Sequence, residues 1–217
     1  MAAKTMVSPQ GKLKWAHIFV PDTKFKSEGQ YHTKLEVPVE AGSELKDSID
    51  RVYENWKKDI LATKGDKNYR EFLPYKILQD EEGLETDISF HFKMKASGVN
   101  NKTGKPFTQR PFVIGPDKTP ITNVEGMIGN GSTAKIAYEF FPYEFGTSIG
   151  VQLRLRGIQV LDVVEYNADA NSGESVFVVE DGFTPLTQST ESQLSKHEVE
   201  VANTEIFLEK NEENGDF

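Results

Sequence analysis

Positively charged and aromatic side chains recur along this chain in a pattern that could bind a single-stranded polyanion. Such a ligand needs cations along its phosphates and flat rings against its unstacked bases. The candidates on the outward positions of two expected strands are Lys93, Lys95, Arg154 and Arg156. The candidates in the neighbouring loops are Lys102, Lys105, Phe107, Arg110, Tyr143 and Phe145.

A plainer explanation competes for several of these residues. Lys and Arg also make the wet side of an ordinary strand soluble, and Phe107 and Phe112 could belong to the core. Tyr143 and Phe145 are stronger candidates, because two aromatic residues in a loop that contains proline and glycine have less reason to be buried.

Alternation of apolar and polar residues predicts the strands that must position these side chains. The expected strands cover residues 13–20, 31–39, 88–96, 107–114, 133–141 and 149–164. In the first, Trp15, His17 and Phe19 fall on one side, opposite Lys14 and Ile18. Residues 100–105 predict a hairpin turn with a basic tip, and residues 142–146 are expected to form the loop between the last two strands.

One amphipathic helix is expected inside this β-rich region. Ser43 is a predicted N-cap, and apolar residues follow at spacings of three and four from Leu45 to Ile60, enough for about four turns. Five or more strands with one inserted helix must bury one face of their sheet by closing it. The predicted fold is therefore mainly β: an OB-fold barrel of about five strands with one inserted α-helix and a flexible acidic C-terminal tail.

The acidic residues are concentrated at the end of the chain. Residues 167–217 carry 12 Asp and Glu against two Lys, whereas residues 1–166 carry 22 against 23 Lys and Arg. The net charge of −9 therefore belongs to the tail. We expect a folded domain over residues 1–166 and an acidic, largely disordered tail over residues 167–217.

Within the tail, residues 175–183 are too apolar for a pure linker. They could add an edge strand to the folded domain or to a second subunit, and the sequence leaves both alternatives open.

Other features of the sequence argue against catalysis, a membrane and a bound metal. Cysteine is absent, and no apolar run approaches the roughly 18 residues that span a bilayer, which favours a protein inside the cell. His17, His32 and His91 lie on expected strands and His197 in the tail, so a metal site would need remote residues. The sequence predicts no enzyme, cofactor or metal.

Two further motifs have ordinary explanations. The stretch from Gly126 imitates a phosphate-binding loop but has Ser132 where that motif needs Lys, and no helix is expected after it. The acidic cluster of residues 80–87 contains Gly83 and is read as a solvated turn rather than a cation site.

Several short motifs resemble the single-stranded-DNA-binding proteins that tailed bacteriophages encode for replication. The resemblance rests on Trp15–Asp22 with residues 29–35, on residues 131–136, on the loop 142–146 with residues 150–155, and on the acidic end Asp216-Phe217. It spans nearly the whole chain in order. One departure is Phe145, which stands where a member of that family has a tryptophan.

The resemblance implies an OB-fold that coats single-stranded DNA without sequence preference in phage replication, recombination and repair. Tyr143 and Phe145 match its base-stacking positions, Lys93 and Lys95 match a basic strand along the DNA groove, and Lys4 matches a basic residue near the N-terminus. The implied partners of the tail are the phage DNA polymerase and helicase-primase, in the cytoplasm of the infected bacterial host cell. The tail residues implied in this contact are Glu209, Glu212, Glu213, Asp216 and Phe217.

A flexible polyanion tethered to a basic groove would also compete with DNA for that groove. The alternative function is a β-barrel module that binds a protein or an oligosaccharide and has no role with DNA. The salt dependence of binding distinguishes these two functions, because binding through phosphates weakens steeply as the salt concentration rises.

Overall fold

The structure is a computed structural model that describes residues 4–65, 67–100, 103–122 and 128–164. The predicted tail, its five partner-binding residues, residues 175–183 and Lys102 lie outside the described residues.

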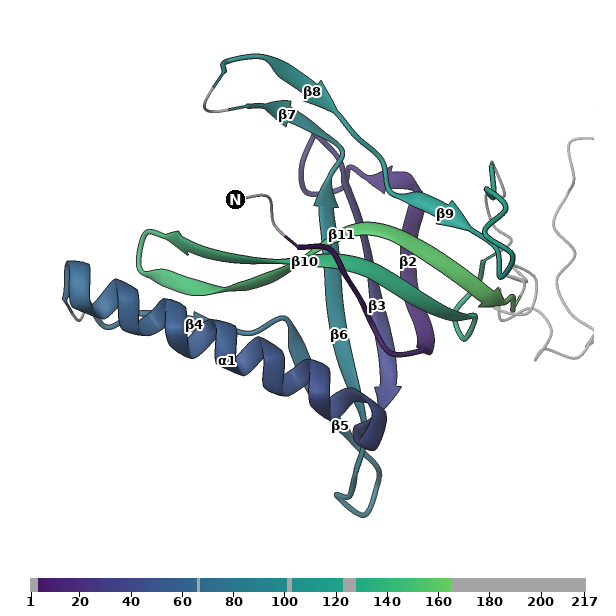
Figure 1. Ribbon diagram of the computed structural model, residues 1–217, viewed down its shortest axis with the longest axis horizontal. Helices are drawn as coiled ribbons and strands as arrows, with labels where there is room; N and C mark the ends of the chain where they lie inside the picture. Colours follow the sequence, from purple (N-terminus) through teal and green to yellow (C-terminus); the bar gives the residue numbers. More distant parts are fainter. Residues whose placement is uncertain (1–3, 66, 101–102, 123–127, 165–217) are drawn as a thin grey trace, which may run out of the picture. The chain divides into compact units, whose positions relative to one another are not determined.

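Five strands close into a barrel, which confirms the predicted OB-fold. They are β2 (Gly11–Asp22), β3 (Gln30–Pro38), β6 (Glu85–Lys95), β10 (Thr133–Phe145) and β11 (Ser148–Asp162). Strand β3 pairs antiparallel with both β2 and β6, while β6 and β11 run parallel. Strand β10 pairs antiparallel with both β11 and β2, so no edge of this five-stranded ring is left open. In Figure 1, β10 and β11 run across the direction of β2, β3 and β6.

The described residues also contain six short strands, of which four extend the sheet of the barrel. The six are β1 (Met6–Val7), β4 (Arg70–Phe72), β5 (Tyr75–Gln79), β7 (Ser97–Val99), β8 (Pro106–Thr108) and β9 (Phe112–Ile114). Strands β7 and β8 form a separate hairpin that projects from the end of β6 in Figure 1, so the predicted hairpin is confirmed. The predicted strand at residues 107–114 is wrong in its extent, because it is divided into β8 and β9 and β9 pairs with β11.

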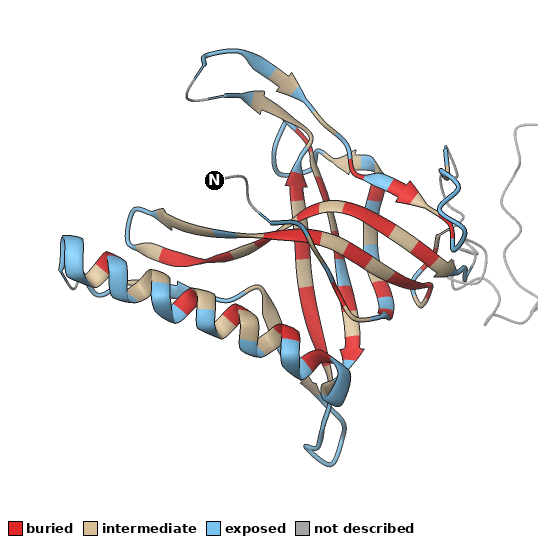
Figure 2. Cartoon of the chain, viewed as in Figure 1, coloured by how far each residue is buried: buried red, intermediate tan, exposed pale blue. Residues whose placement is uncertain are grey.

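The barrel interior is built by the alternating residues of its strands. On β6, Phe90, Phe92 and Met94 are buried, and on β3 the same is true of Leu35 and Val37. Figure 2 shows this alternation as buried and less buried bands along the strands. The outward residues between them are the ones left to contact a ligand.

Strand β2 breaks the predicted alternation. Leu13 and Ile18 are both buried, although an odd spacing places residues on opposite faces of a regular strand. The pairing with β3 shifts between Lys14 and His17, and Trp15 adopts a positive φ of 52°. The predicted sides hold from Trp15 to Ile18, where Trp15 and His17 are exposed and Ile18 is buried. The alternation fails only between Leu13 and Trp15, because a β-bulge inserts an extra residue there and turns Trp15 outward.

The single α-helix of the described residues, α1 (Val39–Lys64), is longer than the predicted four turns. The predicted N-cap at Ser43 is wrong: the helix begins directly after Pro38, and the Ser43 hydroxyl donates to the Glu40 carbonyl inside the first turns. Glu40 lies near the positive end of the helix dipole, which favours this earlier start.

The helix covers the barrel with a stripe of apolar residues. Leu45 and Ile49 join the main core, while Tyr53 and Ile60 pack with the β11 residues Ile149 and Val151. No helix in the described part of the chain is apolar over a length that could cross a membrane.

The predicted loop at residues 142–146 is also wrong. Pro142 to Phe145 continue β10 and pair with β11, so the turn is confined to Gly146 and Thr147. Gly146 has a φ of 58°, a left-handed conformation that suits glycine in a tight hairpin. The two strands therefore form a long hairpin with Phe145 at its tip.

Candidate nucleic-acid interface

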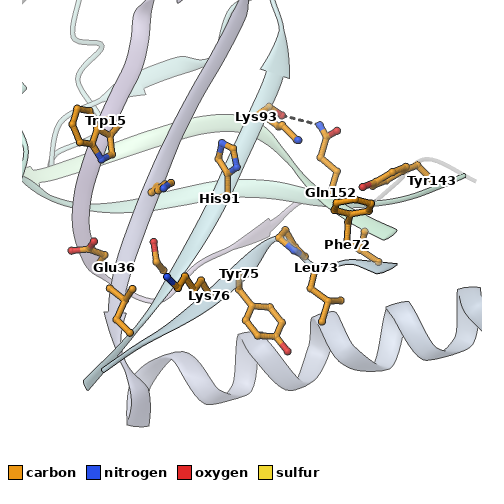
Figure 3. A pocket seen from close by; sticks show the side chains of 15 residues that line it. Trp15, Glu36, Phe72, Leu73, Tyr75, Lys76, His91, Lys93, Tyr143 and Gln152 are labelled. Atoms are coloured by element: carbon orange, nitrogen blue, oxygen red, sulfur yellow. Dashed lines mark hydrogen bonds between the residues drawn. The ribbon is translucent and has the colours of Figure 1, made fainter. Parts of the chain in front are cut away.

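A groove of about 460 Å³ lies on the outward side of β3 and β6. Its lining comes from β2, β3, β6, the β4–β5 segment and the ends of β10 and β11. In Figure 3, Trp15 lies at one end, Phe72 and Tyr143 lie together at the other, and His91 and Lys93 lie between them. Aromatic rings at both ends with basic groups between them are the arrangement that a single nucleic-acid strand requires.

Trp15 is the most exposed aromatic side chain of this groove, with 65% of its surface accessible. Its backbone N–H donates to the Asn130 Oδ1 atom at 2.7 Å, which holds the bulged conformation in place. Phe72 is 49% exposed at the opposite end, and Tyr143 is half-buried beside it. An indole ring that is exposed to water is unfavourable. Because the Trp15 ring is already exposed, a base can stack on it directly.

Lys34 on β3, Lys76 on β5 and Lys93 on β6 supply the positive charge of the groove, and Glu36, which pairs with Lys14, is the acidic residue of its lining. Lys34 and Lys93 make no ion pair with any residue that the structure describes. Lys93 is half-buried, and burial, with a smaller contribution from the nearby Lys26, holds the pKa of its ammonium below the usual value. A phosphate beside this poorly hydrated ammonium would therefore relieve an unfavourable environment.

Two loops at the ends of the barrel strands also present exposed aromatic side chains. Phe25 is 84% exposed between Lys24 and Lys26 in the β2–β3 loop, and Phe145 is 83% exposed at the tip of the β10–β11 hairpin. In OB-folds, the loops at these two topological positions border the face that binds oligonucleotides.

The two predicted arginines of β11 are already engaged. Arg156 Nη2 donates to Glu139 Oε2 at 2.6 Å, and Glu139 is buried. The Arg154 guanidinium lies 3.9 Å from the centroid of the Phe141 ring, a cation–π contact. Arg154 is opposite Lys93 in the β6–β11 register, so it extends the same surface, whereas Arg156 stabilises the barrel wall.

The remaining predicted residues that the structure describes are not part of the groove lining. Lys95 is exposed at the end of β6, two residues beyond Lys93, and Lys105 is exposed at the turn of the β7–β8 hairpin. Phe107 is half-buried with its ring against Gly98 of the same hairpin. Arg110 borders a second hollow, of about 440 Å³, and Lys4 is exposed before β1. Of the predicted residues that the structure describes, Lys93 and Tyr143 are the two that it brings together in the groove.

Three histidines line up across β2, β3 and β6. The His17 and His32 ring centroids are 4.7 Å apart, and those of His32 and His91 are 6.0 Å apart. Burial lowers the pKa of His91 to about 4, and burial also lowers the pKa of His32 despite its contact with Asp22 at 3.4 Å. These two imidazoles are therefore neutral near pH 7.

The fold agrees with solved structures of phage proteins. The chain matches the single-stranded DNA-binding protein encoded by bacteriophage T7 with a TM-score of 0.66 and 22% identity, over 85% of this chain and 100% of that chain. It also matches the single-stranded DNA-binding protein of bacteriophage Enc34 in complex with ssDNA, with a TM-score of 0.53 and 14% identity, over 75% of this chain and 88% of that chain.

A C-terminally truncated form of the Enc34 protein gives the same TM-score of 0.53 at 15% identity. No protein-family model and no curated protein sequence matches the chain. The chain thus shares the fold of these phage single-stranded DNA-binding proteins.

Sequence reasoning missed Trp15, Phe72 and the Lys24-Phe25-Lys26 loop. Strand alternation alone gave no sign that Trp15 is exposed, because the bulge depends on pairing with β3. A clear signal did exist for the loop, where an aromatic residue stands between two lysines in a turn-rich stretch.

Proposed function

We propose that this chain binds single-stranded DNA without sequence preference. The observation that carries the proposal is the groove on β3 and β6, where Trp15 and Tyr143 flank Lys34 and Lys93. Rings accept any base by stacking, and lysines attract any phosphate, so this chemistry does not distinguish sequences. The complex of the Enc34 protein with ssDNA supports this ligand for a barrel of the same fold.

The test is a titration of fluorescent oligo-dT with the full-length protein at several salt concentrations. Log affinity should fall by about 0.7 per tenfold increase in salt for each neutralised phosphate. A barrel that binds a protein or an oligosaccharide would leave oligo-dT unbound, and that result would reject the proposal. Salt-insensitive binding would also reject it, because phosphates would then not be the groups recognised.

The proposed biological role is the protection of single-stranded DNA. A protein that coats single-stranded DNA protects it during phage replication, recombination and repair, without itself catalysing a reaction. Its place of action would be the cytoplasm of an infected bacterial cell. The phage origin of the similarly folded proteins supports this assignment.

The acidic tail is proposed to act as a competitor and a recruiter. With 12 acidic residues against two lysines over residues 167–217, it would occupy the basic groove until DNA arrives. It would then contact the phage polymerase or helicase-primase through its end, where Phe217 supplies an apolar anchor among acidic groups.

Removal of residues 167–217 should tighten oligo-dT binding and abolish capture of these partners. Weaker DNA binding after truncation would contradict the competition. Sedimentation of the full-length and truncated forms tests whether residues 175–183 add an edge strand to a second subunit. In that case only the full-length protein is a homodimer, whereas an edge strand added to the folded domain of the same chain leaves both forms monomeric.

A further inference from the structure

We propose that His17, Asp22 and His32 form a site for a divalent transition-metal ion, with Zn²⁺ as the ion to test. One donor atom from each of these residues lies within 4.8 Å of the other two. This inference concerns metal binding by the chain alone and does not depend on DNA binding.

The strand pairing brings these residues together from separate parts of the sequence. His17 on β2 lies directly opposite His32 on β3 in the register, and the ring centroids are 4.7 Å apart. Asp22 ends β2, and its Oδ2 atom lies 3.4 Å from His32 Nε2. The register shifts between Lys14 and His17 and between His17 and Asp22 allow all three to point to one side.

The carboxylate is already oriented. Asp22 Oδ1 accepts the backbone N–H of Lys24 at 2.8 Å, which leaves Oδ2 directed at His32. A hydrogen bond to the second oxygen of a liganding carboxylate is the usual way in which proteins fix such a group.

The donor set indicates the class of ion. Two imidazole nitrogens and one carboxylate oxygen suit Zn²⁺ and its transition-metal neighbours, whereas Mg²⁺ and Ca²⁺ prefer oxygen ligands throughout. At Zn–ligand distances of about 2.0–2.2 Å, tetrahedral donors lie about 3.4 Å apart, so the side chains must close by up to about 1.4 Å. His17 is exposed, so its ring is free to rotate toward the other two ligands.

The surrounding charges allow a cation here. The positive charge of Lys93 disfavours a second positive charge at His32, and the negative charge of Asp22 opposes this effect. Three protein ligands leave a fourth position open to water. A bound ion would tie β2 to β3 at the base of the loop that carries Lys24, Phe25 and Lys26.

The direct test is calorimetric titration of metal-free, full-length protein with Zn²⁺ near neutral pH. We expect saturable binding of one ion per chain that depends on these residues. Loss of outer-shell partners already weakens metal sites by 10–100-fold, so His17→Gln, His32→Gln and Asp22→Asn should each lower the affinity at least about 10-fold.

His91→Gln is the matched control, because His91 belongs to the same row of histidines but not to the proposed ligand set. It should keep wild-type affinity for Zn²⁺, and so should His197→Gln in the tail. A loss in either control equal to that of His17→Gln would overturn the assigned ligands.

Thermal unfolding provides an independent measurement. Zn²⁺ should raise the Tm of the wild-type protein in a concentration-dependent way and leave the Tm of His17→Gln unchanged. Because His17 is exposed, this variant should have the wild-type Tm without metal, which separates metal loss from misfolding. An equal rise with Mg²⁺, or no saturable Zn²⁺ binding by the wild type, would overturn the proposal.

Discussion

The outward side of β3 and β6 carries Lys34 and Lys93 without a carboxylate partner among the described residues, whereas the outward side of β10 and β11 pairs Arg156 with Glu139. Both surfaces show the same sequence pattern, in which cations alternate with buried apolar residues. The difference lies in the residue opposite each cation. A cation that pairs with a carboxylate on the adjacent strand stabilises the fold. A cation without such a partner is available to bind an anionic ligand.

The largest predicted effect concerns the paired surface. Glu139→Ala removes the partner of Arg156 inside the barrel wall and should lower the free energy of unfolding by about 2–3 kcal/mol. Urea unfolding measures this loss. DNA affinity should stay within a factor of about three, since surface exposure elsewhere is unchanged.

Lys64→Ala is the matched control for this measurement, because it breaks the more exposed ion pair with Glu144. It should cost less than about 1 kcal/mol. Equal losses in the two variants would show that Arg156 has no special structural role.

The second prediction tests the proposed DNA-binding groove. Trp15→Ala removes the most exposed ring of the groove and should weaken oligo-dT binding by about 1–3 kcal/mol, with an unchanged salt slope. Fluorescence titration measures both quantities. Trp15→Phe should restore most of the affinity, and both replacements keep an L side chain at the positive φ, so backbone strain is matched.

Leu84→Ala is the control for loss of an exposed apolar side chain, since Leu84 is 63% exposed and is not part of the groove lining. Its affinity for oligo-dT should equal that of the wild type. If Trp15→Ala behaves like Leu84→Ala, stacking at this position is refuted.

The third prediction concerns the pH dependence of stability that the half-buried His91 causes. Burial, followed by the charges of Lys93, His32 and Lys34, holds the pKa of His91 at about 4, below the usual 6.5. Between about pH 4 and pH 6.5, His91 is therefore protonated in the unfolded chain but neutral in the native state. This contribution to stability is complete above about pH 6.5 and is lost as the pH falls toward 4.

We expect this loss to be on the order of 1–2 kcal/mol, because the ring is half-buried and solvent screens part of the shift. Urea unfolding from pH 7 to pH 5 should show a shallower decline for His91→Gln than for the wild type. Parallel curves for the two proteins would contradict the assignment to His91.

The smallest effect should come from single cations. Lys93→Met keeps the apolar stem but removes the charge, and it should flatten the salt slope by about 0.7 log units per tenfold salt. Lys58→Met on the exposed side of α1 is the control and should leave the slope unchanged. An unaltered salt slope in Lys93→Met would show that Lys93 contacts no phosphate and serves only to make the barrel surface soluble.

Much of the fold was predictable from the sequence because burial imposes a periodicity on it. The alternation at Leu35, Val37, Phe90 and Phe92 identified the strands of the barrel and the faces that point inward. The helix was also predicted, although its start at Val39 was missed because a first turn of mixed polarity carries little periodic signal.

The candidate site was predicted only in part. Lys93 and Tyr143 were among the candidates, but Trp15 and Phe72 were not, and Arg156 was listed beside Lys93 although Glu139 engages it. Periodicity tells which residues point outward from one strand. It carries no information about what lies opposite them on the next strand.

The sequence by itself determined the strand pattern, the one amphipathic helix and the separation of a near-neutral body from an acidic end. The tertiary structure decided which cations remain unpaired, how the bulge exposes Trp15, and that His17 meets His32 and Asp22. The physical reason is that local patterns reflect burial along one strand, whereas charge pairing, stacking surfaces and metal ligands depend on register between strands.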